Sequence, residues 1–379
     1  MIVQAPLLPE YTERTERELT ARIRAAREQL GRRLVILGHH YQQDDVIAFA
    51  DFTGDSLKLA QIAAEQTQAE FIVFCGVHFM AESADILTSE SQQVILPDLS
   101  AGCSMADMAH IDQLEAAWPQ IEKAAPIPLT PITYVNSSAA VKAFVGAHGG
   151  ACCTSSNAKL VLEWALHGAD PHGDPAGGHR VLFLPDQHLG RNTAYALGWP
   201  LESMVVYDPH QPFGGVTPQR LAAARVVLWK GHCSVHQLFK VAHCETLRAR
   251  PEPYRIIVHP ECTWEVCQRA DFVGSTEYIL RTITDAAAGT YWAVGTEIHL
   301  VNRLAGAHPD KHICSLAGMQ CLCSTMYRID LPHLCWVLEN LVAGRVVNRV
   351  SVDPETRRLS RIALDRMLAL RPAQPVSAR

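Results

Sequence analysis

The sequence predicts an α/β protein made of three similar units, each with a small parallel sheet between layers of helices. Three observations predict this class. Short apolar runs end in polar residues and then give way to a helical pattern, as buried parallel strands that lead into helices do. These runs recur along the chain in the same order. Each series ends in a Cys-Ser pair, and recurrence at matched offsets is the signature of an internal repeat.

The apolar runs form three sets. The first runs of the three units are RRLVILGHHYQQDDV, IPLTPITYVNSSAAVKAF and YRIIVHPECTWEV. The second runs are EFIVFCGVHFMAES, GACCTSSNAKLVLE and ADFVGSTEYILRTI, and the third are QQVILPDLS, HRVLFLPDQHLG and YWAVGTEIHLVN. We therefore expect three homologous three-layer α/β/α domains: 1–125 with an N-terminal helix, 126–250 with insertions, and 251–379 with C-terminal helices.

The spacing of the repeats predicts where a functional site lies. Cys103 follows His39 by 64 positions, and Cys323 follows His259 by the same 64. Cys233 follows Tyr134 by 99 positions, and the segments 167–180 and 207–219 absorb the excess as insertions without an assigned role. Ligands of parallel sheets bind beyond the carboxyl ends of the strands. A pseudo-threefold arrangement of the units would aim these strand ends and cysteines at one central active site.

Composition excludes several classes of protein. The 379 residues are 48% hydrophobic and 19% charged, and the net charge of -6 leaves no basic surface for nucleic acid. The first 30 residues lack the apolar core of a signal peptide and predict an exposed charged helix. No apolar stretch approaches the 18 residues of a membrane span. We expect a cytoplasmic protein without nucleic-acid or membrane partners.

Twelve cysteines are many for a chain without a secretory signal, where a disulfide framework is a poor explanation. Cys103, Cys233 and Cys323 are lone cysteines at equivalent positions of the repeats. The C-x2-C pairs of zinc modules and the cysteine run of ferredoxins are missing. Three thiolates on a 4Fe–4S cluster would leave one iron open as a Lewis acid. Spacing alone leaves open both a shared metal site and three separate packing residues.

The other nine cysteines are weaker ligand candidates. Five lie in or beside apolar runs and two lie in helical patterns, where we expect packing roles: Cys75, Cys152, Cys153, Cys262, Cys267, Cys244 and Cys335. Cys314 and Cys321 are closer candidates, and any redox regulation by them stays open. Cys323 is preferred to Cys321 because Ser follows it, as in the other two repeats.

Polar residues at the strand ends are candidates for proton transfer. His39 and His259 each close an apolar strand, and Tyr134 holds the same place in the middle repeat. A positioned phenol such as Tyr41 or Tyr134 works as a general acid or base, and Glu261 is the best carboxylate for a general base. Structural roles for these residues remain the alternative.

Hydroxyl residues stand where three helices are expected to begin. Ser56, Ser155 and Thr276 are either ordinary helix caps or part of a site for a polyanionic substrate, because helix N-termini bind carboxylates and phosphate. The glycine-rich nucleotide motifs and the HExxH and GxSxG motifs are missing.

Ten segments together resemble the quinolinate synthase family. They are GHHYQ (38–42), ADFTGDSL (50–57), GVHFMAESA (76–84), AGCSMAD (101–107), YVNSSAAVKA (134–143), CTSSNA (153–158), LPDQHLG (184–190), HPEC (259–262), GST (274–276) and CLCSTMYRIDL (321–331). The resemblance covers about residues 34–345. It implies three homologous α/β domains around one 4Fe–4S cluster per chain, with Cys103, Cys233 and Cys323 as its ligands.

The resemblance also implies an activity. Quinolinate synthases are transferases of NAD biosynthesis that condense iminoaspartate with dihydroxyacetone phosphate, with loss of phosphate and two waters. The implied substrate-binding residues are His39, Ser56, Tyr134, Asn136, Ser155, His259, Glu261 and Thr276, and the implied catalytic residues are Tyr41, Tyr134, His259 and Glu261. L-aspartate oxidase is the transient partner that the pathway implies.

Two features depart from relatives, and two other functions stay open. Some relatives carry C-x2-C-x2-C near the third ligand, whereas this chain has CxC, so redox control through a disulfide is not expected. Some relatives also have a much shorter second domain. A non-catalytic iron–sulfur sensor or electron carrier would use the same three thiolates. A zinc-dependent hydrolase would use the same His and Glu residues.

Overall fold

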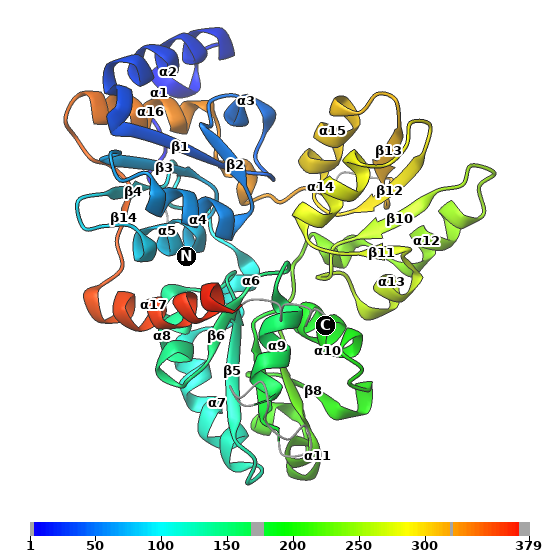
Figure 1. Cartoon of the computed structure of the whole chain (residues 1–379). Coiled ribbons are helices and arrows are strands. Elements are labelled where there is room, and N and C mark those ends of the chain that lie inside the picture. The colour runs from blue at the N-terminus through cyan, green and yellow to red at the C-terminus, as the bar shows by residue number, and fades with distance from the viewer. Residues whose placement is uncertain (1–3, 168–177, 319–320, 371–379) are drawn as a thin grey trace, which may run out of the picture. The chain divides into compact units, whose positions relative to one another are not determined.

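The computed structural model describes residues 4–167, 178–318 and 321–370 of the chain. Its strands form three separate sheets in which all but one of the strand pairings are parallel. Helices flank each sheet (Figure 1). The predicted α/β class with three small parallel sheets is therefore confirmed.

Four strands of each sheet follow the same order, which in the first sheet is read from its β2 end and in the other two from their β6 and β11 ends. The first runs β14-β4-β3-β1-β2, with β1 (Leu34–His39), β2 (Phe52–Gly54), β3 (Phe71–Cys75), β4 (Gln93–Ile95) and the antiparallel β14 (Arg349–Val350). The second runs β6-β5-β7-β9-β8, with β5 (Leu129–Tyr134), β6 (Ala151–Cys153), β7 (Arg180–Leu184), β8 (Met204–Tyr207) and β9 (Val226–Trp229). The third runs β11-β10-β12-β13, with β10 (Arg255–Val258), β11 (Phe272–Val273), β12 (Tyr291–Gly295) and β13 (His312–Ser315).

This shared order corrects how we grouped the apolar runs. β1, β5 and β10 are equivalent, as expected, but β3 is equivalent to β7 and β12 rather than to β6 and β11. The partner of β6 and β11 in the first repeat is the short strand β2, which has too few apolar residues to stand out as a run. Each repeat therefore has a four-strand core in which the first strand lies between the second and the third.

Hydrogen bonds also repeat between the first and third repeats. Asp51 and Asp271 each use one carboxylate oxygen to accept the N–H of a strand residue, Ile36 in one case and Ile256 in the other. The second oxygen of each accepts from an arginine of the helix that precedes the strand, with partners Arg27 and Arg248. These matched side-chain contacts are independent support for the internal repeat.

The described chain divides into two compact units. One contains Met1–Ala106 and Cys233–Asp353, and therefore holds the first and third sheets. The other contains Asp107–His232 and Pro354–Arg379, and therefore holds the second sheet and the last helix. The C-terminal helix was expected within the third domain. In the structure it packs in the unit of the second sheet, although the domain boundaries themselves stay a prediction.

Helices cover both faces of the first sheet (Figure 1). α1 (Pro9–Thr12), α2 (Glu16–Leu30) and α16 (Leu331–Val342) lie on one face, and α4 (Ser56–Glu65) and α5 (His78–Leu87) lie on the other. α2 begins with a capping box formed by Thr15 and Glu18. The N-terminal helix was expected to be exposed, but its apolar stripe of Leu19, Ile23, Ala26 and Leu30 is buried, because α2 packs against α16.

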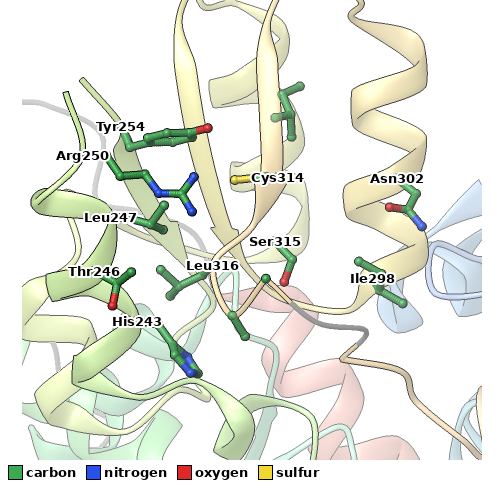
Figure 2. Close-up of a pocket in the computed structure, with 13 residues that line it drawn as sticks. His243, Thr246, Leu247, Arg250, Tyr254, Ile298, Asn302, Cys314, Ser315 and Leu316 are labelled. Carbon is green, nitrogen blue, oxygen red and sulfur yellow. The ribbon is translucent and has the colours of Figure 1, made fainter. Parts of the chain in front are cut away.

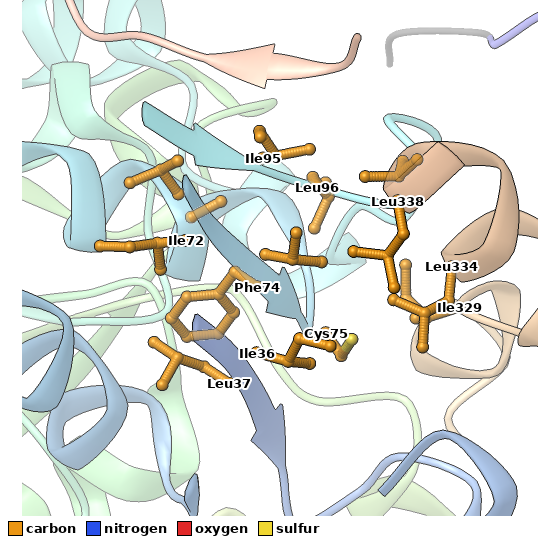
Figure 3. Packing of buried hydrophobic residues seen from close by; sticks show 14 of the residues in the cluster. Ile36, Leu37, Ile72, Phe74, Cys75, Ile95, Leu96, Ile329, Leu334 and Leu338 are labelled. Atoms are coloured by element: carbon orange, nitrogen blue, oxygen red, sulfur yellow. The ribbon is translucent and has the colours of Figure 1, made fainter. Parts of the chain in front are cut away.

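The core of this repeat forms where α16 meets the sheet (Figure 3). Leu334 and Leu338 of α16 approach Cys75 at the end of β3 and Leu96 directly after β4. Every residue of β1 and β3 is buried, as expected for parallel strands covered on both faces. The cysteines that we expected to pack in cores are indeed buried: Cys75, Cys152, Cys153, Cys244, Cys262, Cys267 and Cys335.

The remaining helices cover the other two sheets. Around the third sheet lie α12 (Val241–Arg248), α13 (Trp264–Arg269), α14 (Thr276–Thr284) and α15 (Ile298–Ala307). Around the second sheet lie α7 (Ile111–Lys123), α8 (Ala139–Ala147), α9 (Ala158–Leu166), α10 (Gln187–Ala196), α11 (Pro218–Ala223) and α17 (Pro354–Ala369). The described residues also form short helical segments: α3 (Asp44–Ile47), α6 (Ser104–Asp107), η1 (Gly31–Arg33), η3 (Leu201–Ser203), η4 (Pro212–Gly215), η5 (His236–Leu238) and η6 (Met326–Arg328).

Two further findings concern the insertions and the membrane. Most of the predicted insertion 167–180 lies outside the described residues, and the insertion 207–219 contains η4 and the turn that follows β8. Within the described ranges, no helix combines the length and the apolar character needed to cross a membrane.

Candidate active site

Three cysteine thiols from distant parts of the chain approach one another within the first unit. Burial raises the pKa of Cys103 to about 12, and the neighbouring Cys323 thiol contributes to the rise. Burial also raises the pKa of Cys233, with smaller contributions from Glu261, Cys103 and Cys323. Cys323 packs against the cores of both the first and the third repeat. The structure therefore brings the three predicted ligands into one environment.

Each of these cysteines precedes a single helical turn that points backbone N–H groups at its sulfur. Cys103 accepts from Met105 and Ala106 of α6. Cys233 accepts from His236 at the start of η5. Cys323 accepts from Thr325 and Met326, and its Sγ lies 3.4 Å from the Thr325 hydroxyl. Such donors favour a thiolate, but burial has the larger effect and keeps the pKa of all three thiols raised.

A buried carboxylate ties two of these turns together. Asp98 accepts the N–H of Ser100 with Oδ1 and the Nε–H of Arg328 with Oδ2, both at 2.8 Å. Ser100 belongs to the turn before Cys103, and Arg328 belongs to η6 after Cys323. Because a fully buried carboxylate requires partners, this link holds the Cys103 and Cys323 segments at a defined separation.

The thiols adjoin a buried row of polar side chains. Glu261 Oε2 lies 2.9 Å from His236 Nδ1, in a bent approach that does not meet hydrogen-bond geometry. His236 Nε2 lies 3.2 Å from the Thr296 hydroxyl, which lies 2.9 Å from the Tyr41 hydroxyl. The Tyr41 hydroxyl also lies 3.2 Å from the Thr276 hydroxyl. The row thus runs Glu261–His236–Thr296–Tyr41–Thr276, with members from both repeats of this unit.

The row has a natural direction of hydrogen-bond donation. A carboxylate only accepts, so Glu261 favours the His236 tautomer with its proton on Nδ1. Nε2 then accepts from Thr296, and Thr296, with a single proton, accepts from Tyr41. Burial raises the pKa of Tyr41 far above its ordinary value, and the charge of Glu261 adds to the rise. Tyr41 is therefore a protonated phenol at neutral pH.

His39 and His259 occupy matched positions at the ends of β1 and β10. Nδ1 of His39 accepts the Tyr41 N–H at 3.1 Å, and Nδ1 of His259 accepts the Glu261 N–H at 3.4 Å. Burial lowers the pKa of each histidine to about 3, so both rings are neutral at pH 7. With Nδ1 accepting, each ring carries its proton on Nε2, ready to donate to an anion without bringing a charge.

Ser56 and Thr276 are the first residues of α4 and α14, one residue after the cap position that we considered for them. The capping bonds come instead from the preceding residues, because Asp55 accepts from Lys58 and Ser275 accepts from Tyr278. The interpretation of Ser56 and Thr276 as ordinary caps is therefore wrong. Their hydroxyls stand at helix N-termini, where backbone N–H groups also attract anions.

The remaining predicted site residues belong to the other unit. Tyr134 ends β5, Asn136 follows it, and Ser155 follows β6. Because β5 and β6 are parallel neighbours that pair Tyr134 with Cys153, the three residues share one edge of their sheet. Tyr134 is buried and Asn136 and Ser155 are partly exposed.

Two residues of the row escaped the sequence reasoning. His236 follows Cys233 by three positions, and Thr296 follows the buried strand β12 directly. The rule that singled out His39 and His259, a polar residue at the end of an apolar run, also applies to Thr296. We applied it only to the first run of each repeat, so Thr296 was missed. His236 has no local signal beyond its closeness to Cys233.

A pocket of about 540 Å³ in the third repeat contains none of the predicted site residues. Figure 2 shows Arg250 and Tyr254 on one side of it and Asn302 of α15 on the other, with Cys314 in its wall. Burial raises the pKa of the Cys314 thiol. Cys321 is fully buried, whereas Cys314 is partly exposed, as Cys103, Cys233 and Cys323 are.

Comparison with known proteins identifies the family. Residues 21–369 match the family model described as quinolinate synthetase A protein. Curated relatives named quinolinate synthase include those of Nocardioides sp. (58% identity; 93% of this chain and 89% of the relative), Acidobacterium capsulatum (55%; 96% and 96%) and Geobacillus kaustophilus (57%; 93% and 94%). This similarity extends over nearly the whole chain, as the ten motifs implied. The chain therefore belongs to the quinolinate synthase family of enzymes.

Proposed function

We propose that this chain condenses iminoaspartate with dihydroxyacetone phosphate to form quinolinate, with loss of phosphate and two waters. The observation that carries the proposal is the approach of three cysteine thiols, each of which accepts backbone N–H groups, beside the row of polar side chains that ends in Glu261. Quinolinate is the source of the pyridine ring of NAD, so the reaction serves NAD biosynthesis. An L-aspartate oxidase is the source of iminoaspartate that the pathway implies.

We propose Cys103, Cys233 and Cys323 as the ligands of a 4Fe–4S cluster. The donor set suits such a group, because thiols with raised pKa values become thiolates only beside a strong cationic partner. The nearby Glu261 adds negative charge, which a cationic iron–sulfur core would balance. When bound, a cluster with three cysteine ligands supplies one open iron as a Lewis acid for a substrate oxygen.

The row of polar residues supports a proton-transfer role. Tyr41 is positioned and protonated, as a general acid must be. Thr296 and His236 connect it to Glu261, and the hydrogen bonds of the row lead from Tyr41 toward that carboxylate. Glu261 serves as the general base at the other end. We propose Tyr134 of the second unit as a further proton-transfer residue.

The neutral histidines and the helix N-termini support binding of a polyanion. His39 and His259 each present an Nε2–H group, and we propose that these donate to substrate carboxylates or phosphate. Ser56 and Thr276 at the starts of α4 and α14 offer hydroxyls beside backbone N–H groups. Asn136 and Ser155 are proposed to complete the binding set.

One observation favours a second interpretation of the metal site. Ligand atoms of Cys233, His236 and Glu261 lie within 4.8 Å of one another, which suits a single zinc-like ion. Metal and sulfide analysis of protein purified without oxygen separates the two readings. Iron with equimolar sulfide supports the cluster, and zinc without sulfide supports a mononuclear site.

The function is tested by an anaerobic assay for quinolinate from dihydroxyacetone phosphate and freshly generated iminoaspartate. Wild-type protein should form quinolinate, and Cys103→Ala should lose both the product and the iron–sulfide complement. Cys267→Ala is the matched control, because this buried thiol donates to the Cys262 carbonyl in a core. A full iron–sulfide complement in Cys103→Ala would contradict the ligand assignment.

A further inference from the structure

Arg303 of α15 makes three hydrogen bonds to a loop of the first repeat about 260 positions away. Its Nε donates to Asp44 Oδ1 at 2.8 Å, its Nη1 donates to the His40 carbonyl at 2.9 Å, and its Nη2 donates to the Gln42 carbonyl at 2.7 Å. All three guanidinium nitrogens of Arg303 thus donate to this loop. Asp44 is exposed, whereas the two carbonyl contacts are partly buried.

The two carbonyls belong to the residues on either side of Tyr41. The His40 carbonyl is part of the peptide group that precedes Tyr41, and the Gln42 carbonyl is part of the peptide group that follows Gln42. Holding the backbone on both sides of Tyr41 limits how the segment between them can rotate, and therefore where the Tyr41 side chain points. The hydroxyl end of Tyr41 is held by Thr276 and Thr296, which belong to the same repeat as Arg303. Residues of the third repeat therefore hold both the backbone and the hydroxyl end of this tyrosine, although Tyr41 belongs to the first repeat.

We propose that Arg303 is a positioning residue that holds Tyr41 in line with the Thr296–His236–Glu261 row. The inference rests on the proposed role of Tyr41 in proton transfer. Displacements of about 1 Å in a catalytic group cost as much as 100-fold in rate, so a clamp on the tyrosine backbone matters for turnover. Lysine cannot replace the clamp, because a single ammonium lacks the planar fork that reaches two carbonyls and a carboxylate at once.

The loop has a second attachment that does not involve Arg303. Gln43 Nε2 donates to the carbonyls of Tyr327 and Ile329, both at 3.1 Å. Loss of Arg303 should therefore loosen the loop around Tyr41 without detaching it. For this reason we expect Arg303 variants to fold and to retain the iron–sulfide complement.

The test measures steady-state turnover of Arg303→Gln, Arg303→Lys and Arg303→Ala under anaerobic conditions. We expect kcat to fall about 10- to 100-fold in all three, with KM nearly unchanged and iron and sulfide at wild-type levels. Guanidinium ion, added well below unfolding concentrations, should restore part of kcat in Arg303→Ala only. A purely structural loss would not be restored by a small cation.

Arg248→Gln is the matched control, because Arg248 also donates to one carboxylate and one carbonyl, those of Asp271 and Arg269, away from the Tyr41 loop. Its kcat should stay at the wild-type value. Wild-type kcat in Arg303→Gln, or no response of Arg303→Ala to guanidinium, would overturn the inference. Tyr41→Phe is assayed in parallel: if it turns over normally, the proposed role of Tyr41 fails first, and the positioning inference falls with it.

Discussion

The Thr296 hydroxyl stands between two groups that differ in chemistry, an imidazole on one side and a phenol on the other. A threonine hydroxyl has one proton and two lone pairs, so it can donate to His236 while it accepts from Tyr41. Thr296 is fully buried, so it is shielded from bulk water. The connection between Tyr41 and Glu261 therefore depends on a single oxygen atom.

Removal of that oxygen should slow turnover without changing the fold. Thr296→Val keeps the shape of the side chain but breaks the row, and we expect kcat to fall about 100-fold, as when a general acid–base function is lost. Thr296→Ser should restore most of kcat. Steady-state kinetics and iron–sulfide analysis of the same samples provide the measurement.

Thr130→Val is a suitable control for this substitution. Thr130 is a buried threonine whose hydroxyl lies 2.8 Å from a histidine nitrogen, that of His179, in the other unit. It should leave kcat unchanged. Equal kcat values for wild type and Thr296→Val would remove Thr296 from the proton-transfer row.

The matched histidines make stability depend on pH. Burial lowers the pKa of His39 and His259 to about 3, whereas the unfolded chain binds these protons near pH 6.5. The unfolded state therefore binds more protons below pH 6.5, and the free energy of unfolding falls as the pH falls toward 3. Between pH 7 and pH 5 each histidine should lower the free energy of unfolding by about 2 kcal/mol.

Denaturant unfolding midpoints at pH 7 and pH 5 measure this dependence. The double variant His39→Gln/His259→Gln should show a flatter dependence than wild type. If both proteins lose stability equally on acidification, the acid sensitivity has another origin.

At the scale of elements, α8 and α17 approach each other closely at a glycine. A Cβ atom built on Gly146 of α8 would clash with the Leu359 carbonyl oxygen of α17. The close approach also lets the Ser360 hydroxyl donate to the Ala139 carbonyl at 2.8 Å. The position of the last helix against the second sheet therefore depends on the missing side chain of Gly146.

Substitution of this glycine should destabilise the second unit. Gly146→Ala forces α17 away from α8, and we expect a loss of about 1–3 kcal/mol, as for other overpacked contacts. Gly306→Ala in α15 is the contrasting variant, because its added Cβ would have no atom within 4 Å apart from its chain neighbours and the backbone of its own helix. It should gain about 0.5–1 kcal/mol from helix propensity. Denaturant unfolding measures both, and equal effects would contradict the close approach.

At the scale of the whole molecule, the three candidate cluster ligands belong to one compact unit. Cys103 lies near the end of its first segment, and Cys233 and Cys323 lie in its second. A metal group bound only by the folded unit stabilises it by mass action. Loss of the group should therefore affect the two units unequally.

Hydrogen exchange before and after iron removal by a chelator tests this expectation. Amides in the turns that follow the three cysteines should exchange roughly tenfold faster or more in the iron-free protein. Amides of β7 in the other unit should exchange at nearly the same rate in both forms. Uniform acceleration throughout the chain would show that the group does not act on the first unit alone.

Local sequence patterns were enough to predict many of the strands and several of the candidate site residues. Apolar runs such as Leu34–His39 predict buried strands, because parallel strands covered on both faces need continuous apolar side chains. The three Cys-Ser pairs and the strand-end histidines stood out because they recur at matched offsets. Short strands such as β2 were missed, because three residues are too few for a periodic signal.

The tertiary structure alone decided which side chains meet. The contacts of Thr296 with Tyr41 and of Arg303 with the carbonyls of His40 and Gln42 join residues about 260 positions apart. Such pairs depend on how the first and third repeats pack, and local periodicity carries no information on packing between repeats. The same reason explains why α17 was assigned to the third domain: a helix is predicted by its own residues, but the sheet against which it packs depends on contacts with distant residues such as Gly146 of α8.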